Sequence, residues 1–206
     1  MRMKADKIIF ATGNAGKMKE IRMIMADLNI EVQSMKEADI QAEIVEDGET
    51  FEENAKIKAQ AIAQELRARG ERAIVLADDS GLEIDYLNKE PGVYSARYMG
   101  EDTSYSVKNA SLIQRLEGVP DEERTARFVC VIAAVFPDGS VFETRATIEG
   151  RIGYEERGEN GFGYDPIFYL PEYGMYSAEL APEEKNRISH RGKALEEMKK
   201  VILTQL

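Results

Sequence analysis

Two segments of the sequence carry residue types that could bind phosphate groups and activate water. The first is a glycine-rich turn closed by a lysine, and it consists of Thr12, Gly13, Asn14, Ala15, Gly16 and Lys17. Such a turn exposes backbone N–H groups at the start of a helix, an arrangement that suits phosphate oxygens. It is not a Walker A loop, because Ala11 and Met18 stand where that motif has glycine and serine or threonine. The alternative interpretation is an ordinary strand-to-helix turn with a surface lysine.

The second segment places two adjacent carboxylates, Asp78 and Asp79, directly before Ser80 and Gly81. They follow a short apolar run, and α/β proteins bind ligands at the carboxyl ends of their strands. Carboxylates beside a phosphate ligand indicate Mg²⁺, which prefers oxygen ligands and substrate phosphates. Water bound to the metal or to a carboxylate would then be the nucleophile. The same residues also suit a polar turn with no chemical role.

Three further segments have residue types that fit a nucleotide site but also fit a structural role. The acids between Glu43 and Glu49, including Glu46, could join a metal site or simply favour the dipole of the helix that follows. Gly158–Pro166 combines glycines with aromatic rings and Asp165, which suits either a base-binding surface or a flexible loop. Lys185–Arg191 concentrates basic residues around the only histidine, His190, and could equally be a solvated helix face.

Composition limits the classes of protein to which the chain can belong. Its 206 residues include 43% hydrophobic and 32% charged residues, which is typical of a globular protein with one domain. A net charge of −11 argues against non-specific binding to nucleic acid or membranes. No apolar run reaches the ~18 residues that span a bilayer, and no secretory signal is expected, so we expect a cytoplasmic protein. The single cysteine, Cys130, lies in an apolar segment and is expected in the core.

Periodicity predicts the elements that must position these residues. Strands are expected at 7–12, 30–33, 73–77 (with 82–85 as an extended continuation), 127–136, 141–148 and 165–170, with a hairpin turn at 137–140. Helices are expected after Gly16, after a capping box formed by Thr50 and Glu53, after Thr103 or Ser104, and from Gly192 to the C-terminal Leu206. This order mixes βα units with a hairpin and predicts an α/β protein with a mixed central sheet and flanking helices.

Taken together and in order, six segments resemble the inosine/xanthosine triphosphate pyrophosphatase family. They run nearly from end to end of the chain and comprise Phe10–Lys17, Thr50–Ala55, Ala77–Leu82, Pro91–Tyr98, Gly161–Pro166 and Ser189–Gly192. The resemblance implies one elongated, two-lobed domain over residues 1–206, with the active site in a cleft between the lobes, and a homodimer. It implies Mg²⁺-dependent hydrolysis of inosine, deoxyinosine and xanthosine triphosphates to the monophosphate and pyrophosphate, which would cleanse the nucleotide pool.

The resemblance also implies residue roles. Thr12 to Lys17 would hold the triphosphate, Asp79 would be the general base and a Mg²⁺ ligand, Ser80 would contact substrate, and Glu46 would be a second metal ligand. The base, sugar or phosphate would be surrounded by Phe162, Gly163, Tyr164, Asp165, Lys185, His190 and Arg191. We further hypothesise that His190 and Arg191 donate hydrogen bonds to the 6-oxygen of the purine.

Two rival functions fit parts of the same pattern. A kinase or NTPase that acts on the terminal phosphate would release orthophosphate instead of pyrophosphate, and the missing Walker A pattern argues against it. A nucleotide-binding regulator would bind the same ligand without turnover and would have no use for Asp78 and Asp79 beside a phosphate loop. Product analysis separates the first rival, and a turnover assay separates the second.

Overall fold

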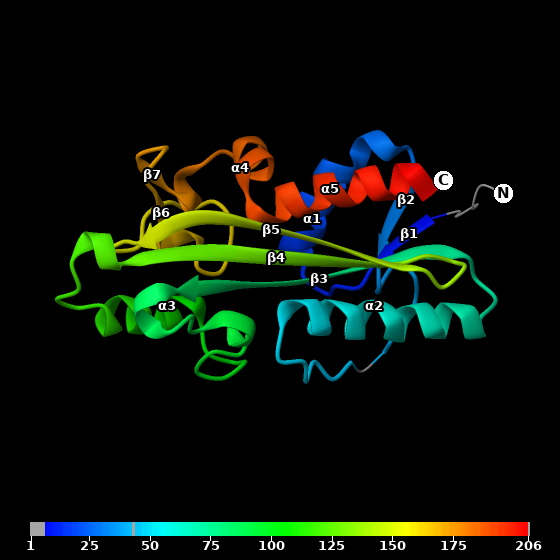
Figure 1. The fold of residues 1–206 in the computed structure, drawn as a ribbon, viewed down its shortest axis with the longest axis horizontal. Helices are drawn as coiled ribbons and strands as arrows, with labels where there is room; N and C mark the ends of the chain where they lie inside the picture. The colour runs from blue at the N-terminus through cyan, green and yellow to red at the C-terminus, as the bar shows by residue number, and fades with distance from the viewer. Residues whose placement is uncertain (1–6, 43, 206) are drawn as a thin grey trace. The chain divides into compact units, whose positions relative to one another are not determined.

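The computed structural model describes residues 7–42 and 44–205, and within them the strands form a mixed sheet in the order β2-β1-β3-β4-β5-β6-β7 (Figure 1). The strands are β1 Lys7–Phe10, β2 Glu31–Ser34, β3 Ala73–Ile84, β4 Thr125–Val135, β5 Val141–Ile152, β6 Phe168–Leu170 and β7 Met175–Tyr176. The α-helices are α1 Ala15–Met25, α2 Phe51–Ala68, α3 Tyr105–Arg115, α4 Pro182–Ile188 and α5 His190–Gln205. The expected mixed α/β architecture is confirmed; the expectations for Glu43 and Leu206 fall outside the described residues.

The described residues divide into two compact units, each built from separate stretches of sequence. The first unit holds residues 7–79 apart from 43, together with 130–146 and 191–205, and the second unit holds 80–129 and 147–190. Strands β3, β4 and β5 each contribute residues to both units. The glycine-rich turn and both aspartates belong to the first unit, whereas the 162–165 segment belongs to the second.

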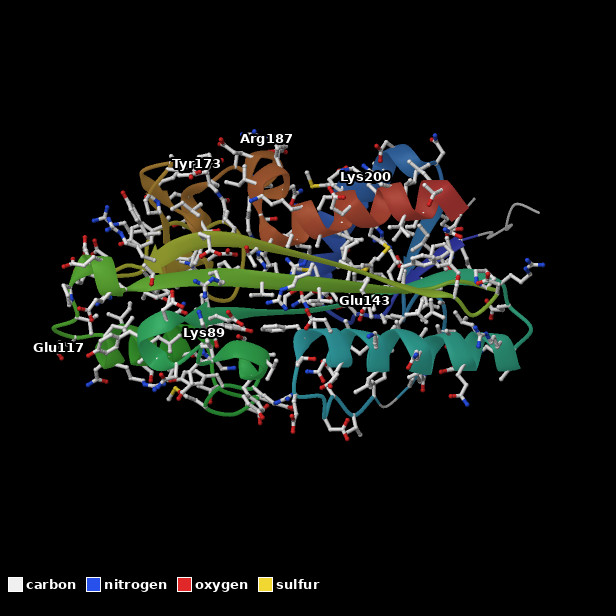
Figure 2. The ribbon with its side chains drawn as sticks, in the orientation of Figure 1. Lys89, Glu117, Glu143, Tyr173, Arg187 and Lys200 are labelled. Carbon is white, nitrogen blue, oxygen red and sulfur yellow. The ribbon has the colours of Figure 1, made fainter. Side chains whose placement is uncertain are left out.

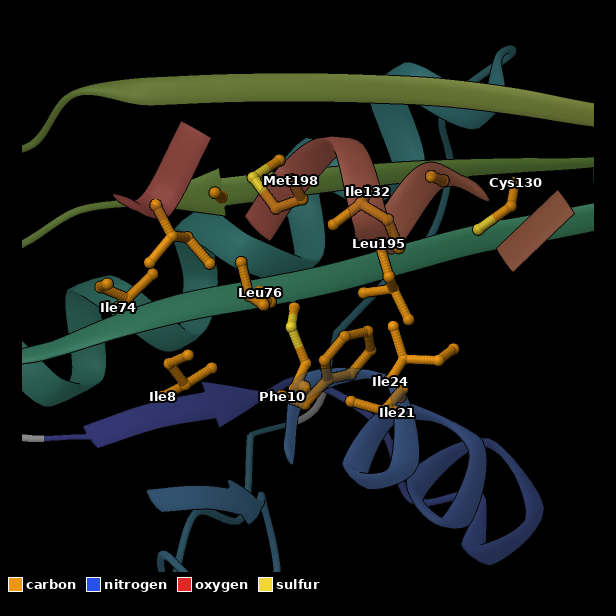
Figure 3. Close-up of a cluster of buried hydrophobic side chains, with 14 of the residues drawn as sticks. Ile8, Phe10, Ile21, Ile24, Ile74, Leu76, Cys130, Ile132, Leu195 and Met198 are labelled. Atoms are coloured by element: carbon orange, nitrogen blue, oxygen red, sulfur yellow. The ribbon is translucent and has the colours of Figure 1, made fainter. Parts of the chain in front are cut away.

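Alternation along the strands builds the core of the first unit. β1 pairs in parallel with β2 and with β3, and one face of these strands packs against α1 and α5 (Figure 3). Because successive side chains of a strand point to opposite faces, alternate strand residues join this cluster, and α5 adds Leu195 and Met198. The strand members include Ile8, Phe10, Ile74, Leu76, Cys130 and Ile132. Cys130 is therefore a core residue, as expected.

Helix α2 begins with the capping box that the sequence predicts. Thr50 Oγ1 accepts from the Glu53 backbone N–H at 3.1 Å, and Glu53 Oε2 accepts from the Thr50 N–H at 3.3 Å. A cap of this kind stabilises a helix by about 1 kcal/mol and fixes which residues point inward. Asn54 and Lys58 are the polar members of the buried face, which comprises Phe51, Asn54, Ala55, Lys58, Ala59, Ile62, Ala63 and Leu66.

The second unit surrounds a separate apolar core. In its part of the sheet, β6 pairs antiparallel with β5 and with β7. Helix α3 begins after Ser104, whose Oγ accepts from the Val107 N–H at 3.4 Å, and it buries Leu112 in this core. Other members of the cluster are Leu82, Ile84, Leu116, Phe128, Ile152, Ile167 and Phe168. Among the described residues, no helix is both long and apolar enough to cross a membrane.

The structure differs from the sequence-based expectation at two strands. The Asp78–Gly81 segment is not a polar turn, because β3 continues through it as far as Ile84. The predicted strand at 165–170 is only half correct: Asp165–Ile167 forms a 3-10 turn, and the strand covers Phe168–Leu170. The short β7 that pairs with it was not predicted, since two residues give no periodic signal.

Candidate active site

The glycine-rich turn lies between β1 and α1, as predicted. The buried Thr12 accepts through Oγ1 from the Asn14 N–H at 3.1 Å, and Asn14 Oδ1 caps α1 by accepting from the Lys17 N–H at 3.0 Å. Residues 13–16 are exposed at this helix N-terminus. The positive end of the helix dipole is therefore accessible to an anion, in a turn that its own side chains already hold in shape.

Asp78 lies on the side of β3 that faces α1 and α5, and it is only 1% exposed. Lys17 Nζ lies 2.9 Å from Asp78 Oδ2, and the Arg191 guanidinium lies 3.5 Å from the same Asp78 oxygen. Arg191 also donates to Glu20 Oε2 at 2.6 Å. Burial alone would raise the pKa of Asp78, but the charges of Lys17, Arg191 and Lys58 outweigh it and hold the pKa well below its usual range. Asp78 is therefore ionised at neutral pH and serves as the counter-charge for these cations.

Asp79 points to the opposite side of β3, toward α2, as strand alternation requires. Asn54 Nδ2 donates to its Oδ2 at 3.1 Å, and Lys58 Nζ lies 3.9 Å from its Oδ1. The same ammonium donates to Glu46 Oε2 at 2.8 Å, so that one lysine links the two carboxylates. The adjacent aspartates therefore have different hydrogen-bond partners, although the charge of Lys58 acts on both, and Asp79 is linked to Glu46 through this lysine.

Asn54 also fixes the loop that carries Glu46. Its Oδ1 accepts from the Gly48 N–H at 2.9 Å while its Nδ2 donates to Asp79. A Cβ atom at position 48 would lie 2.7 Å from that Oδ1, so the close approach requires glycine. The amide thus orders the 46–49 loop and orients the Asp79 carboxylate at the same time.

The surroundings of Asp79 raise its pKa to about 6. Burial is the main cause; Lys58 and Asn54 oppose the rise, while the charges of Glu46 and Asp78 add to it. A carboxylate of this kind is mostly ionised at neutral pH, yet it binds a proton more readily than an ordinary aspartate. That combination is what general base catalysis near neutral pH requires.

In metal-free protein, the Asp79 carboxyl is expected to titrate with a midpoint near pH 6. The folded state then binds this proton more tightly than the unfolded chain, so the contribution to stability is greatest at low pH and is lost as pH rises through about 6. Carboxyl NMR titration of the wild type, with Asp79→Asn to assign the signal, measures the midpoint. Titration at the ordinary value of an aspartate would contradict the expectation.

In the second unit, Asp165 organises the glycine-rich segment. It is 3% exposed, and its carboxylate accepts from the Phe162 N–H at 2.9 Å, from Ser177 Oγ at 2.8 Å and from Lys185 Nζ at 2.8 Å. Lys185 Nζ also lies 5.0 Å from the centre of the Phe162 ring. At Gly161 φ is +77°, and a Cβ atom there would lie 2.3 Å from an Asp165 oxygen. This conformation of the loop therefore requires glycine at position 161.

The neighbouring residues of this loop are held as well. Tyr164 is buried, and its hydroxyl donates to the Ser95 carbonyl at 2.7 Å. Gly163 has φ +69°, and its carbonyl accepts from Asn109 at 3.3 Å.

Ser80, the remaining predicted substrate contact, is half-buried in β3.

The basic segment near the C-terminus is not a solvated helix face. Lys185, His190 and Arg191 are all at most 6% exposed, whereas Arg187 projects from α4 into solvent (Figure 2). The His190 ring stacks on Phe128 with 4.9 Å between ring centres and 16° between planes. The residues selected from the sequence are therefore the buried members of the cluster.

Sequence reasoning missed Asn54, Lys58, Glu20 and Ser177. Asn54 and Lys58 could have been found, because they lie one turn apart on the otherwise apolar face of α2, and a lysine or amide in that position needs a buried partner. Glu20 and Ser177 gave no such signal. Their roles depend on tertiary contacts with Arg191 and Asp165.

Comparison with known proteins gives consistent matches over nearly the whole chain. The Ham1 family matches residues 8–201. A relative from Clostridium perfringens, named dITP/XTP pyrophosphatase, is 49% identical over 194 residues, which is 94% of this chain and 95% of the relative. A protein of the same name from Geobacillus kaustophilus is 49% identical over 189 residues, covering 92% and 90% of the two chains. The solved structure of a HAM1 protein from Coxiella burnetii matches with a TM-score of 0.85 at 41% identity, covering 96% of this chain and 98% of that one.

Proposed function

Because this chain belongs to the Ham1 family, we propose that it is a nucleoside triphosphate pyrophosphatase acting on non-standard purine nucleotides such as dITP, ITP and XTP. Water attacks the α-phosphorus, the bond to the bridging oxygen breaks, and the products are the nucleoside monophosphate and pyrophosphate. The observation that carries the proposal is Asp79, a buried carboxylate with a pKa of about 6. It directly follows Asp78, which pairs with Lys17 of the glycine-rich turn.

In this mechanism the glycine-rich turn binds the triphosphate, and the polar cluster of Asp79, Asn54, Lys58 and Glu46 activates water. Asp79 takes the proton from the attacking water, while Asn54 holds the carboxylate in place. The exposed N-terminus of α1 and Lys17 bind phosphate oxygens, and the ammonium of Lys58 adds positive charge beside Asp79. Asp78 keeps Lys17 and Arg191 in position, so these cations do not have to be ordered when substrate arrives.

Mg²⁺ fits the carboxylates of this cluster. Among the described residues, no group of three or more His, Cys, Asp or Glu side chains could hold a metal by itself. Glu46 and Asp79 nevertheless already share a positive charge, the ammonium of Lys58, at 2.8 and 3.9 Å. Two carboxylates with substrate phosphates and water form a typical Mg²⁺ site, and we propose these two as ligands. When bound, the metal supplies neutralisation of phosphate charge.

In the second unit, the proposal assigns substrate contacts to the ordered loop and its neighbours. Phe162 offers an aromatic face. Asp165 accepts from its backbone N–H, and Lys185 donates to the same carboxylate and lies beside the ring. We propose that this segment contacts the purine base or the sugar, and that both units act as one pyrophosphatase domain over residues 1–206. The cytoplasmic location expected from the sequence is part of the same proposal.

Turnover is expected to require a divalent metal. Chelation should abolish pyrophosphate release from inosine triphosphate, and added Mg²⁺ should restore it, because Lys17 and Lys58 are already paired with the carboxylates of Asp78 and Glu46. Continuous measurement of pyrophosphate before and after each addition tests the expectation. Undiminished turnover in excess chelator would refute the metal assignment.

The protein is also expected to be a homodimer, which the family resemblance implies. Light scattering at micromolar concentration should then give about twice the chain mass of 23.1 kDa. A mass equal to that of one chain would contradict the proposed homodimer.

A further inference from the structure

Helix α3 holds the glycine-rich loop of the second unit through a buried polar side chain. Asn109 is 1% exposed, and its Nδ2 donates to Glu156 Oε1 at 2.7 Å and to the Gly163 carbonyl at 3.3 Å. One turn earlier on α3, the Tyr105 ring meets the Tyr164 ring edge to face, with 5.2 Å between centres and 88° between planes. The helix therefore contacts two consecutive residues of the loop.

The orientation of the Asn109 amide is set by its partners. Both groups near Nδ2 are hydrogen-bond acceptors, so the reversed amide would place Oδ1 against two oxygens. In the observed orientation, Oδ1 is buried and accepts no hydrogen bond from any residue within the described ranges 7–42 and 44–205. Burying a side-chain amide costs free energy that its hydrogen bonds must offset, so asparagine at this position needs a reason.

Packing and helix formation do not supply that reason. Leucine has nearly the same size, favours a helix more strongly and carries no polar atom to bury. Only the two donated hydrogen bonds require the amide, and one of them ends on the carbonyl of Gly163, a residue with φ +69° in an irregular segment. A peptide unit of this kind has no regular ladder of hydrogen bonds to fix its orientation.

We propose that Asn109 is a positioning residue that fixes the Gly163 peptide, and with it the 162–165 backbone, for recognition of the purine base. Glu156 holds the Asn109 amide in the orientation that makes this contact possible. The inference rests on the proposed function, in which this segment contacts the base. The positioning role should therefore affect KM and base selectivity and leave kcat nearly unchanged.

The test compares Asn109→Leu with Gln114→Leu, which makes a similar amide-to-leucine change on an exposed position of the same helix. For Asn109→Leu we expect KM for inosine triphosphate to rise about 3- to 10-fold, as for loss of one or two hydrogen bonds, with kcat within about twofold. The ratio of kcat/KM for inosine to adenosine triphosphate should fall by a similar factor. Gln114→Leu should match the wild type in each measurement.

A second pair of variants tests the role of the carboxylate. Glu156→Gln keeps an oxygen that accepts from Asn109 and should retain the KM of the wild type, whereas Glu156→Ala should resemble Asn109→Leu. Equal KM values in both Glu156 variants would contradict the orienting role. An equal loss of kcat/KM for both nucleotides in Asn109→Leu would show a general structural defect and overturn the selectivity role.

Hydrogen exchange of the free protein separates this inference from the proposed function. The amides of residues 161–164 should exchange faster in Asn109→Leu than in the wild type and in Gln114→Leu, whether or not any nucleotide is hydrolysed. Unchanged exchange would overturn the positioning role even if the enzyme is active. Faster exchange in Asn109→Leu, combined with no nucleotide hydrolysis by the wild type, would instead refute the proposed function and leave the positioning role standing.

Discussion

Replacing Asp79 with asparagine is expected to lower kcat for inosine triphosphate by at least ~10²- to 10⁴-fold, the usual loss when a general base is removed. The substitution keeps the shape of the side chain and an oxygen for the Asn54 amide. It removes the proton acceptor and the negative charge beside Lys58 and Glu46. The fold should be retained, because the wild-type carboxylate is buried at a pKa of about 6 and its charged form is not what stabilises the structure.

The matched control for this variant is Asp138→Asn. Asp138 is a carboxylate in the turn between β4 and β5 that accepts from Ser140, and it has no part in the candidate site. Pyrophosphate release at saturating Mg²⁺ should be close to the wild-type rate in the control. If Asp79→Asn retains more than about a tenth of the wild-type rate, Asp79 is not the base.

The second large effect is expected at Arg191, where loss of the guanidinium should reduce preference for inosine over adenosine triphosphate. The 6-oxygen of hypoxanthine accepts hydrogen bonds, whereas the 6-amino group of adenine donates them and would oppose a donor. Sites that leave polar groups unpaired with the wrong substrate discriminate by ~10⁴–10⁵-fold. Arg191→Ala should therefore lower kcat/KM strongly for inosine triphosphate and much less for adenosine triphosphate.

The Arg191 guanidinium also contributes to stability, so its effect on the fold must be distinguished from its effect on base selectivity. The Arg191 guanidinium is buried against Glu20 and Asp78, so Arg191→Ala leaves two carboxylates without this cation and should destabilise the fold by about 3–5 kcal/mol. Arg191→Lys keeps the charge but loses the planar fork of donors. Base recognition by the fork predicts that the lysine variant unfolds near the wild-type temperature yet loses selectivity. An equal proportional loss of kcat/KM for both nucleotides would contradict base recognition. Arg191 would then serve to pair with Asp78, to bind phosphates or to stabilise the fold.

The elements of this protein could be predicted from sequence wherever a local physical signal was strong. The capping box of Thr50 and Glu53 and the apolar face of α1 gave the correct helices. Asp78–Gly81 was ambiguous, because Asp, Ser and Gly favour turns locally. In the folded chain, however, the segment is the middle of a long strand. Tertiary pairing overrides such a local preference, and a single sequence does not reveal it.

The candidate site was predictable to a similar degree. The sequence selected Asp79 and Lys185 by residue type, and both are buried in polar clusters. It could not show that the two adjacent aspartates face opposite sides of β3, since that follows from an extended backbone and not from the residues themselves. Lys58 was overlooked because a lysine within a helix is usually solvated.

Hydrolysis of inosine triphosphate in ¹⁸O-labelled water, followed by ³¹P NMR and mass analysis, tests attack on the α-phosphorus. We expect inosine monophosphate carrying one labelled oxygen, together with unlabelled pyrophosphate, in a reaction that requires Mg²⁺ and is lost in Asp79→Asn. Release of labelled orthophosphate with inosine diphosphate would identify attack on the terminal phosphate and contradict the proposed function. Nucleotide binding without any turnover would contradict it equally.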